Sequence, residues 1–174
     1  MLAVDLILES CGTFTMSKLR PTVLFIHGNW HTPAHFAPVR YVFQQAGYPI
    51  SCPALSNTQS DISLGLFEDA RVIEDELTRL IEEEGKDVVV IGHSYGGVIA
   101  TQAGKQKFSK KERQKNGKAG GILRLMYMCA FLVAEGESLL NGMGIRDGEP
   151  MPPFLTVDVR ILTSHSLYWD RSAD

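Results

Sequence analysis

The sequence predicts an α/β fold built on a mostly parallel β-sheet. Short β-branched runs alternate with amphipathic helical segments along the chain, and several of these runs are apolar throughout and followed by glycine. A continuously apolar strand suits a sheet that is covered by helices on both faces. The alternation of strands and helices implies right-handed crossovers. We therefore expect about four parallel strands flanked by helices.

The first half of the chain supplies two of these strands and two helices. Thr22 to Gly28, TVLFIHG, is a continuous apolar run that ends in glycine. Residues 35–48 repeat apolar side chains at helical spacing, and residues 49–55 predict a short strand. Residues 62–85 give the clearest helix, because one apolar stripe opposes an acidic face and a glycine ends the pattern.

The second half adds two strands and one helix. Residues 87–92 are the next strand, residues 95–106 the next helix, and residues 121–132 a further apolar strand. The segment 104–120 holds seven basic residues and one acid, which raises the question of a nucleic-acid patch. No aromatic platform or binding motif accompanies these charges, so we expect a solvated loop that extends the preceding helix.

The composition excludes several classes of protein. The chain has 174 residues, of which 44% are hydrophobic, enough for one domain with a core. Its net charge of −3 gives no general attraction to polyanions, so no nucleic-acid partner is expected. No apolar run is long enough to span a bilayer, and Asp5 and Glu9 argue against a signal peptide. Three widely spaced cysteines favour reduced thiols in an intracellular, cytoplasmic protein with no metal site.

The regular pattern covers only part of the chain. Residues 1–18 have no clear period, and we expect a disordered extension there. Residues 19–142 contain all the predicted strands and helices and form one domain. Residues 143–174 are rich in Gly and Pro at their start and predict an irregular tail.

A serine stands in a sharp bend between a strand and a helix. Residues 92–96, GHSYG, match the pattern G-x-S-x-G in the strand–turn–helix context that this pattern requires. Such a turn holds Ser94 above the sheet in a strained conformation, and Gly92 and Gly96 leave room for strand and helix to cross. Free N–H groups at the start of the helix, near Tyr95, favour negative charge at the serine. The alternative is that the glycines serve packing and Ser94 is only a helix cap.

A second motif, FIHGNW at residues 25–30, ends the first strand. Together with GHSYG it resembles the α/β-hydrolase superfamily, specifically the small esterases of the branch that also holds hydroxynitrile lyases and plant methyl esterases. The resemblance covers residues 20–142 through the segments 21–39, 46–55, 88–100 and 120–140, in the order of the family. It implies a partial α/β-hydrolase fold, a small ester or related acyl substrate, and no cofactor or metal.

The resemblance also implies roles for individual residues. Ser94 corresponds to the nucleophile, and the backbone N–H groups of Asn29 and Tyr95 correspond to the oxyanion hole. His27, beside Gly28, is expected to brace the loop through hydrogen bonds. The other histidines nearby are expected to be structural or surface residues: His31, His35 and His93.

A serine nucleophile needs a histidine base and an acid, which follow it in this fold in the order Ser, acid, His. His165 is the only histidine after Ser94, and the acid candidates are Asp158 and Glu135. Members of the family usually have about 250 residues, so we expect a shortened chain in which the strand at 121–132 lacks its usual neighbour. An exposed apolar edge of this kind favours self-association or a partner that covers it.

Two functions remain open at this point. The first is a metal-free serine hydrolase that acts on a small ester. The second is an inactive remnant or a small-ligand-binding module, because the sequence supplies no convincing triad acid and histidine. A dinucleotide site is not favoured, since GHSYGG lacks the G-x-G-x-x-G spacing.

Overall fold

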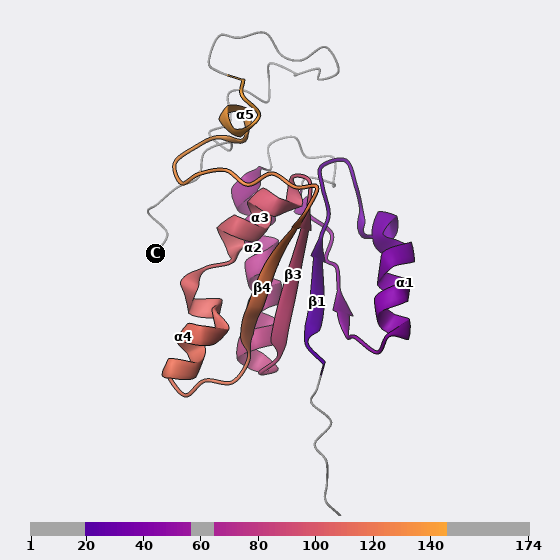
Figure 1. Cartoon of the computed structure of the whole chain (residues 1–174), viewed down its shortest axis with the longest axis vertical. Helices are drawn as coiled ribbons and strands as arrows, with labels where there is room; N and C mark the ends of the chain where they lie inside the picture. Colours follow the sequence, from indigo (N-terminus) through magenta and orange to yellow (C-terminus); the bar gives the residue numbers. More distant parts are fainter. Residues whose placement is uncertain (1–19, 57–64, 146–174) are drawn as a thin grey trace, which may run out of the picture.

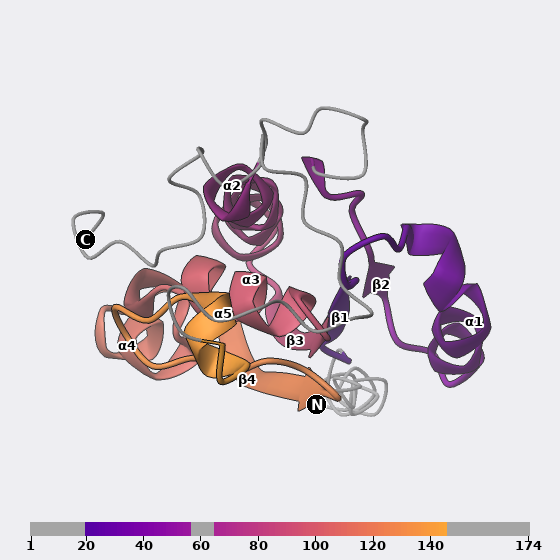
Figure 2. The same cartoon turned by 90° about the horizontal axis from the view of Figure 1, so that it is seen from above.

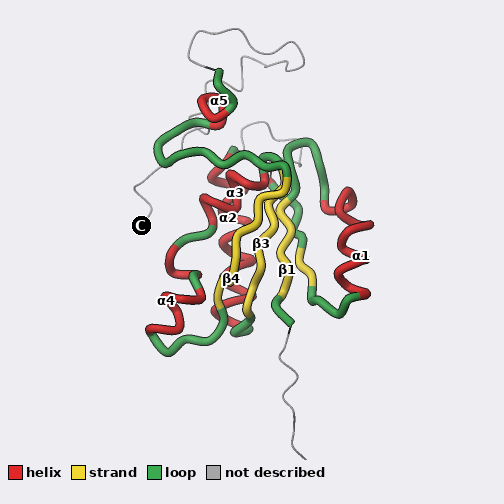
Figure 3. Tube along the Cα trace, viewed as in Figure 1, coloured by secondary structure: helices red, strands yellow, loops and turns green. Residues whose placement is uncertain are grey.

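A computed structural model describes residues 20–56 and 65–145 of the chain. Four parallel strands form one sheet in the order β2-β1-β3-β4, and they lie side by side in Figure 3. Their bounds are Thr22–Ile26 for β1, Ile50–Ser51 for β2, Asp87–His93 for β3 and Gly121–Met128 for β4. The predicted α/β fold, with about four parallel strands flanked by helices, is confirmed.

Helices cover both faces of this sheet. The helix α1 spans Ala37–Gln45 and follows a short 3-10 turn, η1, at Pro33–Phe36. The helix α2 spans Leu66–Leu77 and continues as a π-helical stretch, η3, at Thr78–Glu83, while α3 spans Gly96–Ala103. Figure 1 shows α2 and α3 packed together beside the strands, and Figure 2 shows α1 standing apart from them, near β2.

The first strand explains why its sequence is apolar throughout. Leu24 and Ile26 pack into the larger core cluster with residues of α2 and α3. Val23 and Phe25 point to the opposite face, where the ring of Phe25 lies 5.5 Å from that of Phe43 on α1. Every residue of β1 is buried as a result, as expected for a central parallel strand.

The basic segment 104–120 is not the solvated loop that the sequence predicted. It forms a 3-10 turn, η4, at Gln106–Phe108 and a helix, α4, at Lys110–Lys115. Phe108 is fully buried, and the buried Arg113 donates hydrogen bonds to the backbone carbonyls of Ile81, Ala119 and Gly120. The high charge of the segment gave no sign that these two side chains are buried. Through Arg113, α4 is attached to η3.

The last described strand is shorter than predicted. β4 ends at Met128 rather than at residue 132, because Cys129 adopts a left-handed backbone with φ of 45° and turns the chain away. A short helix, α5, follows at Leu139–Gly142, and the hydroxyl of Ser138 accepts a hydrogen bond from the N–H of Asn141 at its start.

The outer side of β4 is an edge of the sheet. Within the described residues no strand pairs with that side, although Ser109 makes an isolated parallel bridge to Ile122 near its start. Large apolar side chains of β4 are exposed here: Leu123, Met126, Tyr127 and Met128. None of the described helices has the length and apolar character needed to cross a membrane.

Candidate active site

Ser94 occupies a tight turn that we call the elbow, residues 92–96, between β3 and α3. Its φ is 55°, a left-handed conformation that is uncommon for a residue other than glycine. This conformation costs about 1 to 2 kcal/mol and persists only where the surroundings impose it. The residue is partly exposed rather than sealed in the core.

Two glycines of the elbow are required by close backbone contact. A Cβ atom added to Gly92 would lie 2.6 Å from the carbonyl oxygen of Gly96. A Cβ atom added to Gly96 would come closer still to the carbonyl oxygen of Ile26 on β1. Any side chain at either position would push α3 away from the sheet. The G-x-S-x-G spacing therefore reflects contact between strand and helix in this molecule.

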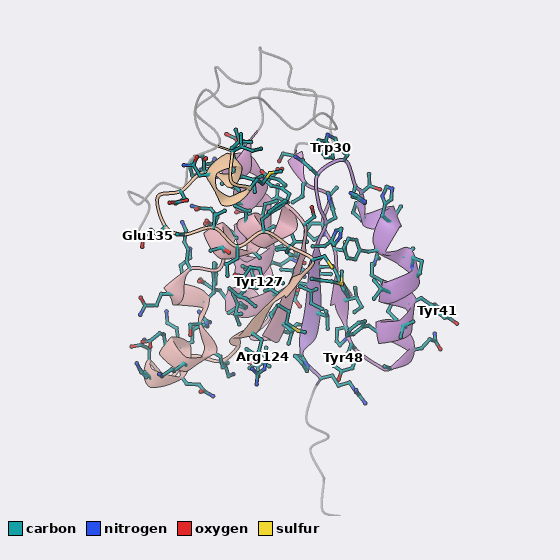
Figure 4. All side chains as sticks on the ribbon, turned by 45° about the horizontal axis from the view of Figure 1, so that its top comes forward. Trp30, Tyr41, Tyr48, Arg124, Tyr127 and Glu135 are labelled. Carbon is teal, nitrogen blue, oxygen red and sulfur yellow. The ribbon has the colours of Figure 1, made fainter. Side chains whose placement is uncertain are left out.

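Three strained residues gather at the carboxyl end of the sheet. Trp30, Ser94 and Cys129, with φ of 60°, 55° and 45°, follow β1, β3 and β4 respectively. The N–H of Ser94 donates to the carbonyl of Cys129 over 3.2 Å, and the N–H of Phe131 donates back to the carbonyl of Ser94 over 3.1 Å. Ligands of open parallel sheets bind at this end of the strands. Trp30 is 81% exposed there and projects at the top of the molecule in Figure 4.

The loop after β1 lies directly against the serine. A Cβ atom added to Gly28 would lie 2.9 Å from the Cβ of Ser94. The carbonyl of Gly28 accepts hydrogen bonds from Nδ1 of His27 over 3.0 Å and from the N–H of His31 over 3.3 Å. All described peptide bonds are trans, so these two bonds fix the plane of the peptide whose other end carries the N–H of Asn29.

His27 joins this loop to the next one. The N–H of Leu55 donates to Nε2 of His27 over 3.3 Å, so Nε2 carries no proton. The proton of the neutral ring is then on Nδ1, which donates to the carbonyl of Gly28. The ring is fully buried, and this burial lowers the pKa of His27. His27 thus acts as a neutral brace between two loops beside Ser94.

The other nearby histidines form a cluster of rings, with His31 and His35 after β1 and His93 at the end of β3. The ring of His31 lies 4.8 Å from that of His35 and 5.8 Å from that of His93. Nδ1 of His31 lies 2.8 Å from the carbonyl oxygen of Asn29, and Nδ1 of His35 accepts from the N–H of Thr32. Nδ1 of His93 is buried without a hydrogen-bond partner among the described residues.

The structure brings some of the predicted site residues together and leaves others apart. His27, Gly28 and Asn29 follow β1, and Gly28 lies directly against Ser94 of the elbow. Tyr95 follows Ser94 at the start of α3. Glu135 lies on the exposed loop after β4, and Figure 4 shows it at the side of the molecule away from Trp30. The predicted base and acid, His165 and Asp158, lie outside the described residues.

The sequence prediction missed one residue near the site. Asp69 is fully buried on the apolar stripe of α2, which also contains Leu66, Ala70 and Ile73. The hydroxyl of Tyr95 donates to Oδ2 of Asp69 over 3.4 Å. Burial and the negative charge of Asp69 raise the pKa of Tyr95 well above its usual value, so the phenol stays protonated. The sequence signal that points to Asp69 is a carboxylate at a core position of a helix, because a carboxylate is rarely buried there without a partner.

A parallel sheet with a serine on a glycine-flanked strand–helix elbow defines the class of α/β hydrolases. The profile of the alpha/beta hydrolase family matches residues 23–173 of this sequence. The chain therefore belongs to the alpha/beta hydrolase family. Within residues 20–56 and 65–145, no group of three or more His, Cys, Asp or Glu side chains is arranged to hold a metal ion.

Two curated relatives show how much of the family's length the chain spans. It is 30% identical to the alpha/beta hydrolase nvfD of Aspergillus novofumigatus over 78% of this chain and 53% of that protein. It is 27% identical to a carbendazim hydrolyzing esterase of a Nocardioides species over 67% of this chain and 45% of that protein. The chain thus spans about half the length of these relatives.

Solved structures agree on the fold. Polyneuridine aldehyde esterase superposes with a TM-score of 0.55 at 15% identity, over 72% of this chain and 46% of that one. An extracellular alpha/beta-hydrolase from a Paenibacillus species gives a TM-score of 0.53 at 20% identity, over 70% and 45%. At these identities the match concerns the fold alone.

Proposed function

We propose that this chain carries the nucleophile and the oxyanion hole of a serine hydrolase that acts on a small ester or related acyl substrate. The observation that carries the proposal is the strained backbone of Ser94, packed against Gly28 of the β1 loop. Membership of the alpha/beta hydrolase family supports it. The esterase names of relatives such as the carbendazim hydrolyzing esterase favour an ester-type substrate.

In the proposed reaction, Oγ of Ser94 attacks the acyl carbon while its proton passes to a base. The carbonyl oxygen becomes an oxyanion, which accepts hydrogen bonds from the N–H groups of Asn29 and Tyr95. Each such donor lowers the barrier by about 3 kcal/mol in comparable enzymes. The alcohol leaves with the proton from the base, and water then hydrolyses the acyl-serine ester and regenerates the hydroxyl of Ser94.

The base and the acid of this reaction are expected after Ser94 in the chain. We assign the base to His165 and the acid to Asp158 or Glu135, because these residues follow Ser94 in the chain order that the fold uses. Among the histidines of the described residues, His27, His31 and His35 make their hydrogen bonds to the loops after β1 and β2.

Labelling with a fluorophosphonate tests the nucleophile. The folded chain is incubated with the probe, and the modified peptide is identified by mass spectrometry. We expect one adduct at Ser94, its loss in the variant Ser94→Ala, and unchanged labelling in the control Ser138→Ala, which removes a helix cap far along the chain. A folded wild-type chain without an adduct at Ser94 overturns the proposal.

A second candidate function is binding of a small apolar ligand without turnover. The observation in its favour is that no hydrogen bond joins the hydroxyl of Ser94 to a histidine within the described residues. Hydrolysis of p-nitrophenyl acetate that is lost on His165→Ala supports the hydrolase. Saturable binding of a short ester with no release of alcohol, in the wild type and in this variant, supports the second candidate.

A further inference from the structure

The buried carboxylate of Asp69 contacts the residue that follows the serine. Asp69 lies on α2 among buried apolar residues and has no solvent exposure. Tyr95 lies at the start of α3 and is 7% exposed. The Oη of Tyr95 donates to Oδ2 of Asp69 over 3.4 Å. A carboxylate is kept in a core only where polar groups compensate its lost hydration. This pair therefore links α2 to the elbow through a polar contact inside an apolar core.

The side chain and the backbone of Tyr95 lie in different surroundings. Its side chain extends into the core, where it belongs to the same cluster as Leu66, Ile73 and Val98. Its backbone is the N-terminal boundary of α3 and follows Ser94 directly, so its N–H belongs to the peptide that joins the two residues. A ring that is anchored in the core limits rotation of this peptide. Catalytic donors must be held within about 0.5 Å of their working position to be effective.

We propose that Asp69 is a positioning residue: by holding the phenol of Tyr95, it fixes the backbone N–H of Tyr95 toward the oxygen of the reacting acyl group. This inference rests on the proposed function, because it requires Ser94 to be the nucleophile. It adds a residue from α2, an element that precedes the elbow and contributes no group to the reaction itself.

The chemistry of the pair supports this role. Burial and the negative charges of Asp69 and Glu68 raise the pKa of Tyr95, so its hydroxyl stays protonated and can donate to Asp69 at neutral pH. To hold the hydroxyl of Tyr95, the residue at position 69 must supply an acceptor oxygen, and the amide oxygen of asparagine would serve as well. A leucine of similar size would not.

The test measures the rate constant and the affinity of fluorophosphonate labelling at Ser94 separately. The variants are Tyr95→Phe, Asp69→Leu and Asp69→Asn. The matched control is Tyr127→Phe, which removes another tyrosine hydroxyl that contacts α3, the one 2.9 Å from Oγ1 of Thr101. The final labelled fraction and the thermal unfolding midpoint are recorded for each protein, so that loss of folded protein is separated from slow reaction.

We expect Tyr95→Phe and Asp69→Leu to lower the maximal labelling rate constant by about ten- to a hundredfold, with unchanged probe affinity and complete final labelling. We expect Asp69→Asn to stay within about threefold of the wild type because it keeps the acceptor. Tyr127→Phe is expected to match the wild type.

Two results overturn the inference while leaving the nucleophile in place. One is a wild-type rate in Tyr95→Phe, which keeps the volume of the ring and so tests the contact even if Asp69→Leu does not fold. The other is an equal loss in Tyr127→Phe, which would indicate general loosening of α3. A folded wild-type chain that is not labelled at all overturns the proposed function, and the inference with it.

Discussion

The centre of the sheet and its β4 edge differ in how completely they are packed. At the centre, Gly28, Gly92 and Gly96 stand where an added Cβ would collide with neighbouring atoms. At the edge, Met126 and Met128 are 48% and 40% exposed, and no described strand covers them. The candidate site belongs to the packed centre. Its geometry is therefore set by the contact of β1, β3 and α3.

The largest contrast is expected between two glycines that receive the same substitution. Gly96→Ala forces a Cβ against the carbonyl of Ile26, so we expect a loss of about 3 kcal/mol in the free energy of unfolding. Gly117→Ala meets no atom within 4 Å, and only its φ of 67° opposes a side chain, at about 1 kcal/mol. Urea unfolding of both variants measures the difference. Equal losses would contradict the close-contact account of the elbow.

Arg113 tests whether the basic segment is anchored as the structure shows. Arg113→Leu removes the donors to the carbonyls of Ile81, Ala119 and Gly120, and we expect a loss of about 2 kcal/mol. The control Lys115→Ala, on the same helix and solvent-exposed, is expected to change stability by less than about 0.5 kcal/mol. Urea unfolding measures both. A loss no larger than that of the control would mean that the segment is a loop after all.

The pH dependence of stability tests the brace at His27. Burial lowers its pKa, so between this lowered pKa and about 6.5 the unfolded chain binds a proton that the folded chain does not. Stability then falls as the pH drops through this window, by at most about 1.4 kcal/mol per pH unit, and it is independent of this group above the window.

Replacement of the ring separates this contribution from those of the other histidines. His27→Gln removes the titrating group and keeps a donor and an acceptor. Thermal unfolding between pH 5 and 8 should show a flatter dependence for the variant. A variant as steep as the wild type would show that His27 is not kept neutral by the fold.

The β4 edge yields the smallest effect on folding and a separate effect on association. Met126→Lys places a charge on an exposed strand position, which opposes edge-to-edge pairing. We expect a stability change below about 0.5 kcal/mol and a smaller aggregated fraction by light scattering. The control Val42→Lys, on an exposed position of α1, should leave aggregation unchanged. Equal improvement in both variants would remove the special role of β4.

The features that could be predicted from the sequence are those that depend on neighbouring residues in the chain. Strands β1 and β3 and the elbow depend on contiguous residues, and contiguous residues show their period and their glycine spacing directly. The pair of Asp69 and Tyr95 and the anchors Phe108 and Arg113 depend on contacts between distant segments. The sequence alone does not show which distant segments these residues contact, so it does not show that they are buried.

One predicted strand also ends at a different residue in the structure. The end of β4 was predicted too late because the left-handed turn at Cys129 interrupts an apolar run that continues to Leu132. Residues 62–64 of the predicted second helix and the expected N-terminal extension lie outside the described residues. So does most of the expected tail, apart from its first residues.

The most direct test of the site is a crystal structure of the chain after reaction with a fluorophosphonate. The account predicts a phosphonyl group on Oγ of Ser94 whose free oxygen lies about 2.7 to 3.1 Å from the backbone nitrogens of both Asn29 and Tyr95. An adduct on Ser94 whose oxygen points to solvent, with neither nitrogen in reach, would contradict it.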